Sequence, residues 1–244
     1  MALSLLEWFG SDLGEHNAVV DAARINSACP FIGVTCDKPK VDGIPSGACS
    51  VVTPSGERVV ICPNRMYADN YRVLSDVARI AFGADVRVIH PDAAAQHDGN
   101  EVVAFGHRFG RELRLPGVRG RRGYFVDWIL AHLNRDGALE DFVALEIQTI
   151  DTTGNYGDAI RALRQGNDAP PRSTAGLNWE NVNKRIIPQL MYKGQVLRRE
   201  AKCTKGLFFA CPGPVYRRIE ERIGAAMQEY PNLQPGSLTF CWYD

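Results

Sequence analysis

From Met66 onward, segments with the residue spacing of strands alternate with segments that have the spacing of helices, and this alternation constrains the fold most. The pattern predicts strands at 84–90, 100–107, the start of 123–134, 137–150 and 237–243, helices at 66–82, the rest of 123–134, 155–166 and 179–199 (interrupted near Pro188), and a strand, turn and helix within 205–224. Strands that alternate with helices predict an α/β fold, in which one central sheet is covered by helices on both faces. The chain of 244 residues is long enough for one large domain, or for a domain with a smaller appended module.

The segment 27–65 has a different character, since it is rich in Gly, Pro and Ser and has short β-like runs. Its stretch "TPSGER", between "CSVV" and "VVIC", predicts a β-hairpin. So few large apolar residues cannot form much of a core, and something else should hold this segment together. We therefore divide the chain into an N-terminal helical segment (1–26), a small β-rich module (27–65) and a core (66–244).

Four of the seven cysteines, Cys29, Cys36, Cys49 and Cys62, fall within this module. Four thiolates can hold zinc or iron in a closed, structural site. The six, twelve and twelve intervening residues do not match the short C-x-x-C spacing of zinc knuckles, so spacing alone does not favour a metal. The odd cysteine count and an N-terminus without a basic stretch argue against a secreted disulfide protein and for a cytoplasmic one. No apolar run is long enough for a membrane span.

Basic residues are concentrated in one segment, although Lys and Arg together balance Asp and Glu at 28 each. The segment 107–122 contains a single acid, Glu112, and six arginines: Arg108, Arg111, Arg114, Arg119, Arg121 and Arg122. Arginine-rich, glycine-punctuated segments are suited to phosphate contacts and guanine edges. A solvated basic loop is an equally good interpretation of this pattern.

Polar residues also interrupt two of the predicted strands. Asp127 lies in an apolar run, and Glu146 and Gln148, two positions apart on the next strand, share one face. Two carboxylates on adjacent strands can bind Mg²⁺, with Gln148 placed to orient a water or contact a phosphate, as in phosphodiester hydrolases. Asp127 alone is better explained as a core carboxylate bonded to an arginine, whereas the three residues together favour a site.

The arrangement of Asp127, Glu146 and Gln148 resembles the PD-(D/E)xK nuclease signature, with Gln148 in place of the lysine. More specifically, "FVDWILAHL", "EIQTIDTTGNY" and the words between Asn178 and Ile219 resemble restriction endonucleases of the NotI type. The resemblance implies a restriction-endonuclease-like core with a mixed sheet and flanking helices. It also implies Mg²⁺-dependent cleavage of double-stranded DNA by a homodimer, and a separate four-cysteine iron site.

Carried over to this chain, the resemblance assigns Mg²⁺ to Asp127 and Glu146, with Gln148 as the third catalytic residue. It assigns a structural Fe or Zn to Cys29, Cys36, Cys49 and Cys62. We expect a type II enzyme that cuts a palindromic site, contacts DNA through the arginines and works with a cognate DNA methyltransferase. The alternatives are an inactive, metal-stabilised DNA-binding protein and a repair or structure-selective nuclease. Lys184 could supply a relocated cation, although an exposed helix lysine is the favoured interpretation.

Overall fold

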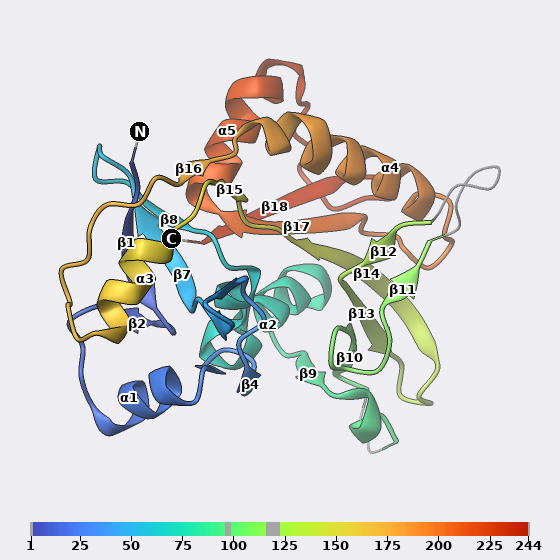
Figure 1. Ribbon diagram of the computed structural model, residues 1–244. Helices are drawn as coiled ribbons and strands as arrows, with labels where there is room; N and C mark the ends of the chain where they lie inside the picture. Colours follow the sequence, from blue (N-terminus) through green and yellow to red (C-terminus); the bar gives the residue numbers. More distant parts are fainter. Residues whose placement is uncertain (1, 96–98, 116–122, 244) are drawn as a thin grey trace.

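A six-stranded mixed sheet forms the centre of the protein in the computed structural model, which describes residues 2–95, 99–115 and 123–243. The strand order is β18 (Leu238–Tyr243), β17 (Leu207–Pro212), β14 (Leu139–Ile147), β13 (Trp128–Leu133), β10 (Glu101–Gly106) and β9 (Arg87–Ile89) (Figure 1). β14, β17 and β18 are parallel neighbours, as are β9 and β10, whereas β13 is antiparallel to both β10 and β14. The mixed α/β architecture predicted from the alternating pattern is confirmed.

Helices cover both faces of this sheet. α4 (Ile187–Leu197) and α5 (Gly213–Ile223) lie on one face, and α2 (Ala68–Phe82) lies on the other (Figure 1). Because successive strand residues point to opposite faces, β14 and β17 contribute to two separate cores. Ala144, Leu207 and Phe209 pack on the α4 and α5 side, and Val143, Leu145 and Phe208 pack on the α2 side. Glu146 alternates with Leu145 and therefore points to the α4 side.

A smaller four-stranded sheet holds the N-terminal part together. Its order is β2 (Ser11–Asp12), β1 (Ser4–Trp8), β7 (Ala48–Val52) and β8 (Arg58–Val60), and the predicted hairpin joins β7 to β8. The expected N-terminal helical segment (1–26) is wrong for its first half, since only α1 (Ala18–Ile25) is helical in it. Residues 4–8 form a strand because β7 offers them an antiparallel partner, and this tertiary pairing overrides local helical spacing.

Two short hairpins, β3 (Ala28–Cys29) with β4 (Val34–Thr35) and β5 (Lys40–Val41) with β6 (Ile44–Pro45), complete the cysteine-bearing segment. α3 (Gly157–Arg164) holds the second hairpin, because Arg161 bonds Asp42 at 2.8 Å and Arg164 bonds three backbone carbonyls of the hairpin. The remaining elements are η1 (Pro63–Tyr67), η2 (Pro91–Ala93), η4 (Gly224–Ala226) and the pairs β11 (Leu113–Arg114) with β12 (Phe125–Val126) and β15 (Thr152–Thr153) with β16 (Gly176–Leu177). In the described part of the chain, no helix is both long and apolar enough to cross a membrane.

The run after Asp127 is the clearest difference between the predicted and the observed elements. Its apolar residues favour a helix locally, yet residues 128–133 form β13. β13 is hydrogen-bonded on both sides, by β10 and β14, so every second residue enters one of two cores. The predicted interruption near Pro188 corresponds to the change from the π-helix η3 (Val182–Ile186) to α4.

Candidate active site

Asp127 and Glu146 lie side by side, at the junction of β12 with β13 and near the end of β14. The backbone N–H of Asp127 donates to Glu146 Oε1 at 3.4 Å, and the N–H of Ile147 donates to Asp127 Oδ2 at 2.9 Å. Each carboxylate is thus held by the backbone beside the other. The antiparallel register pairs Trp128 with Leu145, which places the two acids at the same end of the two strands.

The Lys193 ammonium lies against this pair. Lys193 Nζ is 2.5 Å from Glu146 Oε2, and the two residues are only 3% and 5% exposed. The lysine comes from α4, whose buried residues are Leu190, Lys193 and Leu197. Its spacing therefore places Lys193 on the apolar stripe of the helix, between two leucines. The sequence does carry this signal, but the strand-based motif does not extend to the helix and therefore misses the lysine.

Lys184, the lysine that we considered as a relocated cation, lies elsewhere. Its side chain is 75% exposed and pairs with Glu180 at 3.2 Å, one turn away on the same helical stretch. The favoured interpretation of Lys184, an exposed helix lysine, is therefore the one that the structure matches. The buried cation of the site is Lys193 instead.

Burial and mutual repulsion disfavour ionisation of the two carboxyl groups. Burial raises the pKa of Glu146, the negative charge of Asp127 raises it further, and Lys193 opposes both effects, so that the pKa is about 7. Burial also raises the pKa of Asp127, while the N–H of Ile147 and the charge of Lys193 lower it. The single positive charge of Lys193 does not balance the two negative charges of the ionised carboxylates. The pair therefore favours an additional cation.

A third acid lies close to this pair. The charge of Glu112 contributes to the raised pKa of Asp127, and Glu112 Oε1 is 3.7 Å from His107 Nδ1. Gln148 directly follows β14, is half-buried, and donates its backbone N–H to the Ala210 carbonyl at 3.1 Å. Its position two residues after Glu146 continues the strand geometry that the sequence predicted.

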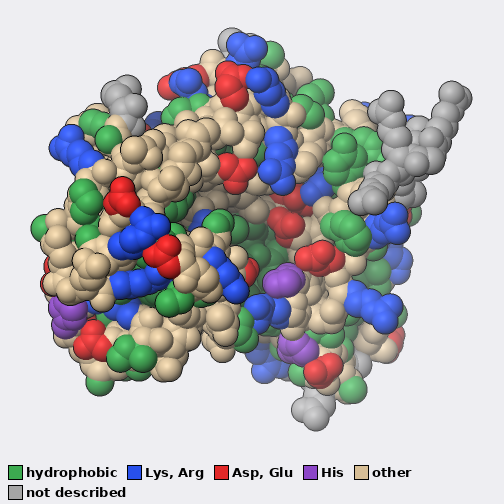
Figure 2. Space-filling view, in the orientation of Figure 1, with side chains coloured by type: hydrophobic (Ala, Val, Ile, Leu, Met, Phe, Trp, Pro, Cys, Tyr) green, Lys and Arg blue, Asp and Glu red, His purple; other side chains and the backbone are tan. Residues whose placement is uncertain are grey.

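The basic segment is described only in part. Arg108, Arg111 and Arg114 are exposed, and the guanidinium of Arg114 lies 6.0 Å from the ring centre of Phe125. Arg119, Arg121 and Arg122 lie outside the described residues. The three described arginines come from the segment that links β10 to β12, and β12 ends immediately before Asp127. The side of the molecule shown in Figure 2 is hollowed in its middle, with acidic and basic side chains around the hollow.

Comparison with known families identifies the family of the chain. The family model described as "Restriction endonuclease NotI" matches residues 9–211, which is most of the chain and includes both carboxylates, Gln148 and Lys193. The protein belongs to the NotI restriction endonuclease family. It is therefore a restriction endonuclease, an enzyme that cuts DNA at a specific site. Among curated proteins, none matches the sequence.

The expected four-cysteine metal site of this NotI-family chain finds no support in the structure. Cys29, Cys36, Cys49 and Cys62 are all buried, but in the described ranges no group of three or more His, Cys, Asp or Glu side chains is arranged to hold a metal ion. Cys49 Sγ instead donates to the Gly47 carbonyl at 3.4 Å. Burial raises the pKa of Cys29 and Cys36, and the charge of Cys62 raises both further.

The other two thiols interact with each other. A hydrogen bond between Cys49 and Cys62 raises the pKa of Cys49 and lowers that of Cys62 to about 7. Only Cys62 is therefore close to ionisation at neutral pH. All four thiols are buried and pack the module, and Cys62 interacts with each of the other three.

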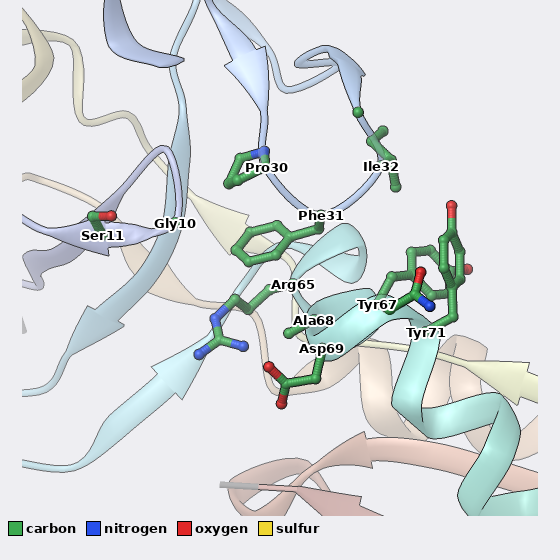
Figure 3. A pocket seen from close by; sticks show the side chains of 12 residues that line it. Gly10, Ser11, Pro30, Phe31, Ile32, Arg65, Tyr67, Ala68, Asp69 and Tyr71 are labelled. Atoms are coloured by element: carbon green, nitrogen blue, oxygen red, sulfur yellow. The ribbon is translucent and has the colours of Figure 1, made fainter. Parts of the chain in front are cut away.

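A cavity of about 670 Å³ lies between the cysteine-bearing segment and the start of α2. Figure 3 shows Phe31 and Arg65 at its centre, with Asp69 and Tyr71 on the α2 side. The ring of Tyr71 packs against Trp128, the residue that follows Asp127, with 5.9 Å between the ring centres. The wall of the cavity is thus connected by direct packing to the strand that positions the first carboxylate.

Proposed function

We propose that this member of the NotI family is a Mg²⁺-dependent type II endonuclease that hydrolyses phosphodiester bonds in double-stranded DNA at a palindromic site. The observation that supports this most is the pairing of half-buried Asp127 with buried Glu146, held together by backbone hydrogen bonds at the ends of adjacent strands. We further assign the central sheet and its helices to the restriction-endonuclease-like core of the PD-(D/E)xK superfamily. The order of strands and the Glu-x-Gln spacing at the end of β14 support this assignment.

Asp127 and Glu146 would hold the Mg²⁺. Mg²⁺ is usually bound in proteins by one or two carboxylates together with water and phosphate oxygens, so these two side chains are a sufficient protein contribution. When both carboxyl groups are ionised, the charge of Lys193 does not neutralise them fully, as the raised pKa of each group indicates. When bound, the ion would neutralise charge on the scissile phosphate and lower the pKa of the attacking water.

The remaining residues of the site would position the substrate. Gln148, on the face of Glu146, would orient the attacking water or contact the phosphate through its side-chain amide. The arginines of segment 107–122 would contact phosphates and base edges, since the described ones are exposed and lie on the chain just before Asp127. A two-fold homodimer would match the symmetry of a palindromic site. A cognate methyltransferase would protect the host DNA.

Sequence recognition would come from loops of the core and from the module at 27–65. The cavity between this module and α2 supports this proposal. Phe31 and Arg65 line this cavity and contact each other. Tyr67 and Tyr71, which also line it, pack against each other, and Tyr71 packs against Trp128.

The decisive experiment is digestion of genomic DNA with Mg²⁺, followed by sequencing of the ends. Discrete ends that share one palindromic sequence are the expected result, and Asp127→Ala should remove cleavage. Asp136→Ala, in the exposed turn before β14, is the matched control and should cut normally. If wild type binds duplex DNA without cutting it, the protein is an inactive DNA-binding relative. Ends defined by DNA structure rather than by sequence would instead identify a repair nuclease.

A further inference from the structure

We propose that Lys193, on α4, takes over the function of the lysine that the PD-(D/E)xK motif carries where this chain has Gln148. This inference rests on the proposed nuclease function and adds to it the source of the missing positive charge. The juxtaposition that supports it is the 2.5 Å contact between Lys193 Nζ and Glu146 Oε2, inside a site where both residues are almost fully buried.

Burial of a lysine at this position is costly for the fold. A lysine is almost never fully buried unless it is paired, and a buried ion pair is often no more stable than apolar residues of similar volume. Leu190 and Leu197 flank Lys193 on the buried stripe of α4, so an apolar side chain would continue the packing there. The stability of the fold therefore does not explain a lysine at this position, whereas a function for its charge in the active site does.

The geometry brings the charge to the place where a motif lysine would lie. Glu146 and Gln148 are two residues apart at the end of β14, so both belong to the sheet face that α4 covers. An ammonium that reaches Glu146 from α4 enters the same space as a side chain from position 148. The chain thus carries a carboxamide on the strand and the cation on the helix above it.

Other cations close to this part of the sequence are engaged elsewhere. Lys184 pairs with Glu180, and Arg185 bonds Asp151 at 3.4 Å with its own side chain 57% exposed. Lys193, by contrast, contacts a carboxylate of the candidate site directly. Its buried position also keeps the charge in surroundings where water screens it poorly, which strengthens its effect on nearby anions.

In the reaction, Lys193 acts as a fixed positive charge and hydrogen-bond donor. It holds Glu146 in place and, beside that carboxylate, donates to the attacking water or to a phosphate oxygen that gains negative charge in the transition state. Preorganised donors of this kind contribute most in sites from which water is excluded.

The test compares single-turnover cleavage, in Mg²⁺, of a DNA fragment that wild type cuts. Lys193→Met should slow cleavage by about 100-fold or more, the effect typical of losing one transition-state donor. Lys184→Met is the matched control and should cut as fast as wild type. Duplex binding in Ca²⁺ and the thermal unfolding midpoint show whether each variant remains folded.

The double variant Lys193→Met/Gln148→Lys returns the charge to the strand, and we expect it to recover at least about tenfold of the lost rate. Recovery distinguishes a catalytic charge from a structural one, because a lysine at position 148 does not restore the α4 contact. Wild-type cleavage by Lys193→Met would overturn the proposal, as would a loss that Gln148→Lys fails to recover. Either result leaves the proposed nuclease function intact, since that function depends on wild-type cleavage and on its loss in Asp127→Ala.

Discussion

Replacement of Glu146 by glutamine should make the unfolding free energy of the metal-free protein rise relative to wild type as the pH increases. Burial and the charge of Asp127 raise the pKa of Glu146 from 4.5 to about 7. Because the folded-state pKa lies above the unfolded value, the carboxyl group favours the folded state least when it is ionised. Its contribution to stability is therefore present below about pH 4.5 and is lost as the pH rises through 7.

The magnitude follows from the same two pKa values. A difference from 4.5 to about 7, at about 1.4 kcal/mol for each pKa unit, corresponds to about 3 kcal/mol at pH well above 7. Glutamine has nearly the same shape and cannot ionise, so the variant lacks this penalty. The difference in unfolding free energy between Glu146→Gln and wild type should therefore move by about 2.5 kcal/mol in favour of the variant between pH 5 and pH 8.5, because part of the change has already occurred at pH 5.

Urea unfolding in EDTA, at several pH values between 5 and 8.5, measures this difference directly. The comparison of variant with wild type at each pH cancels the titration of all other groups that the substitution leaves unchanged. Glu200→Gln, an exposed substitution near the end of α4, is the control and should show no such trend. A difference that stays constant with pH, or that moves toward wild type as the pH rises, would refute the reasoning. Added Mg²⁺ should stabilise wild type more than Glu146→Gln at pH 8.5.

Three further predictions concern the DNA contacts and the fold. Arg108→Ala should weaken duplex binding and reduce the salt dependence of log K by about one unit, as measured by fluorescence anisotropy at several salt concentrations; an unchanged salt dependence would contradict a phosphate contact. Phe208→Ala, in the fully buried middle of β17, should lower the unfolding free energy by about 3–5 kcal/mol in urea titrations, and a loss below about 1 kcal/mol would contradict the packing described above. Asn17→Ala removes the side-chain oxygen that accepts from the N–H groups of Val19 and Val20, and should cost about 1 kcal/mol of stability in the same assay, whereas Asn17→Ser should retain most of it.

Most of the core could be predicted because its elements have strong local patterns. The apolar spacing of Leu74, Val77 and Ala81 identifies α2, and the predicted strand at 137–150 contains β14. The same alternation places Glu146 and Gln148 on one face without any knowledge of the fold. Residues 4–8 and 128–133 were predicted wrongly, because their apolar residues suit either a helix or a strand and only the neighbouring strands decide between them.

Some features of the candidate site were also predictable from the sequence, and others were set only by the tertiary structure. The sequence by itself determined the succession of elements, the hairpin of the N-terminal module, and the acidic positions 127 and 146, since each depends on residues close together in the chain. Only the tertiary structure brought Asp127 onto Glu146 and placed the ammonium of Lys193 against the same carboxylate. It also placed the four cysteines of the module in buried positions, although no group of three or more metal-ligand side chains is found among the described residues. The physical reason is that pairing of distant strands and docking of a helix set these distances, and neither leaves a signal in local spacing.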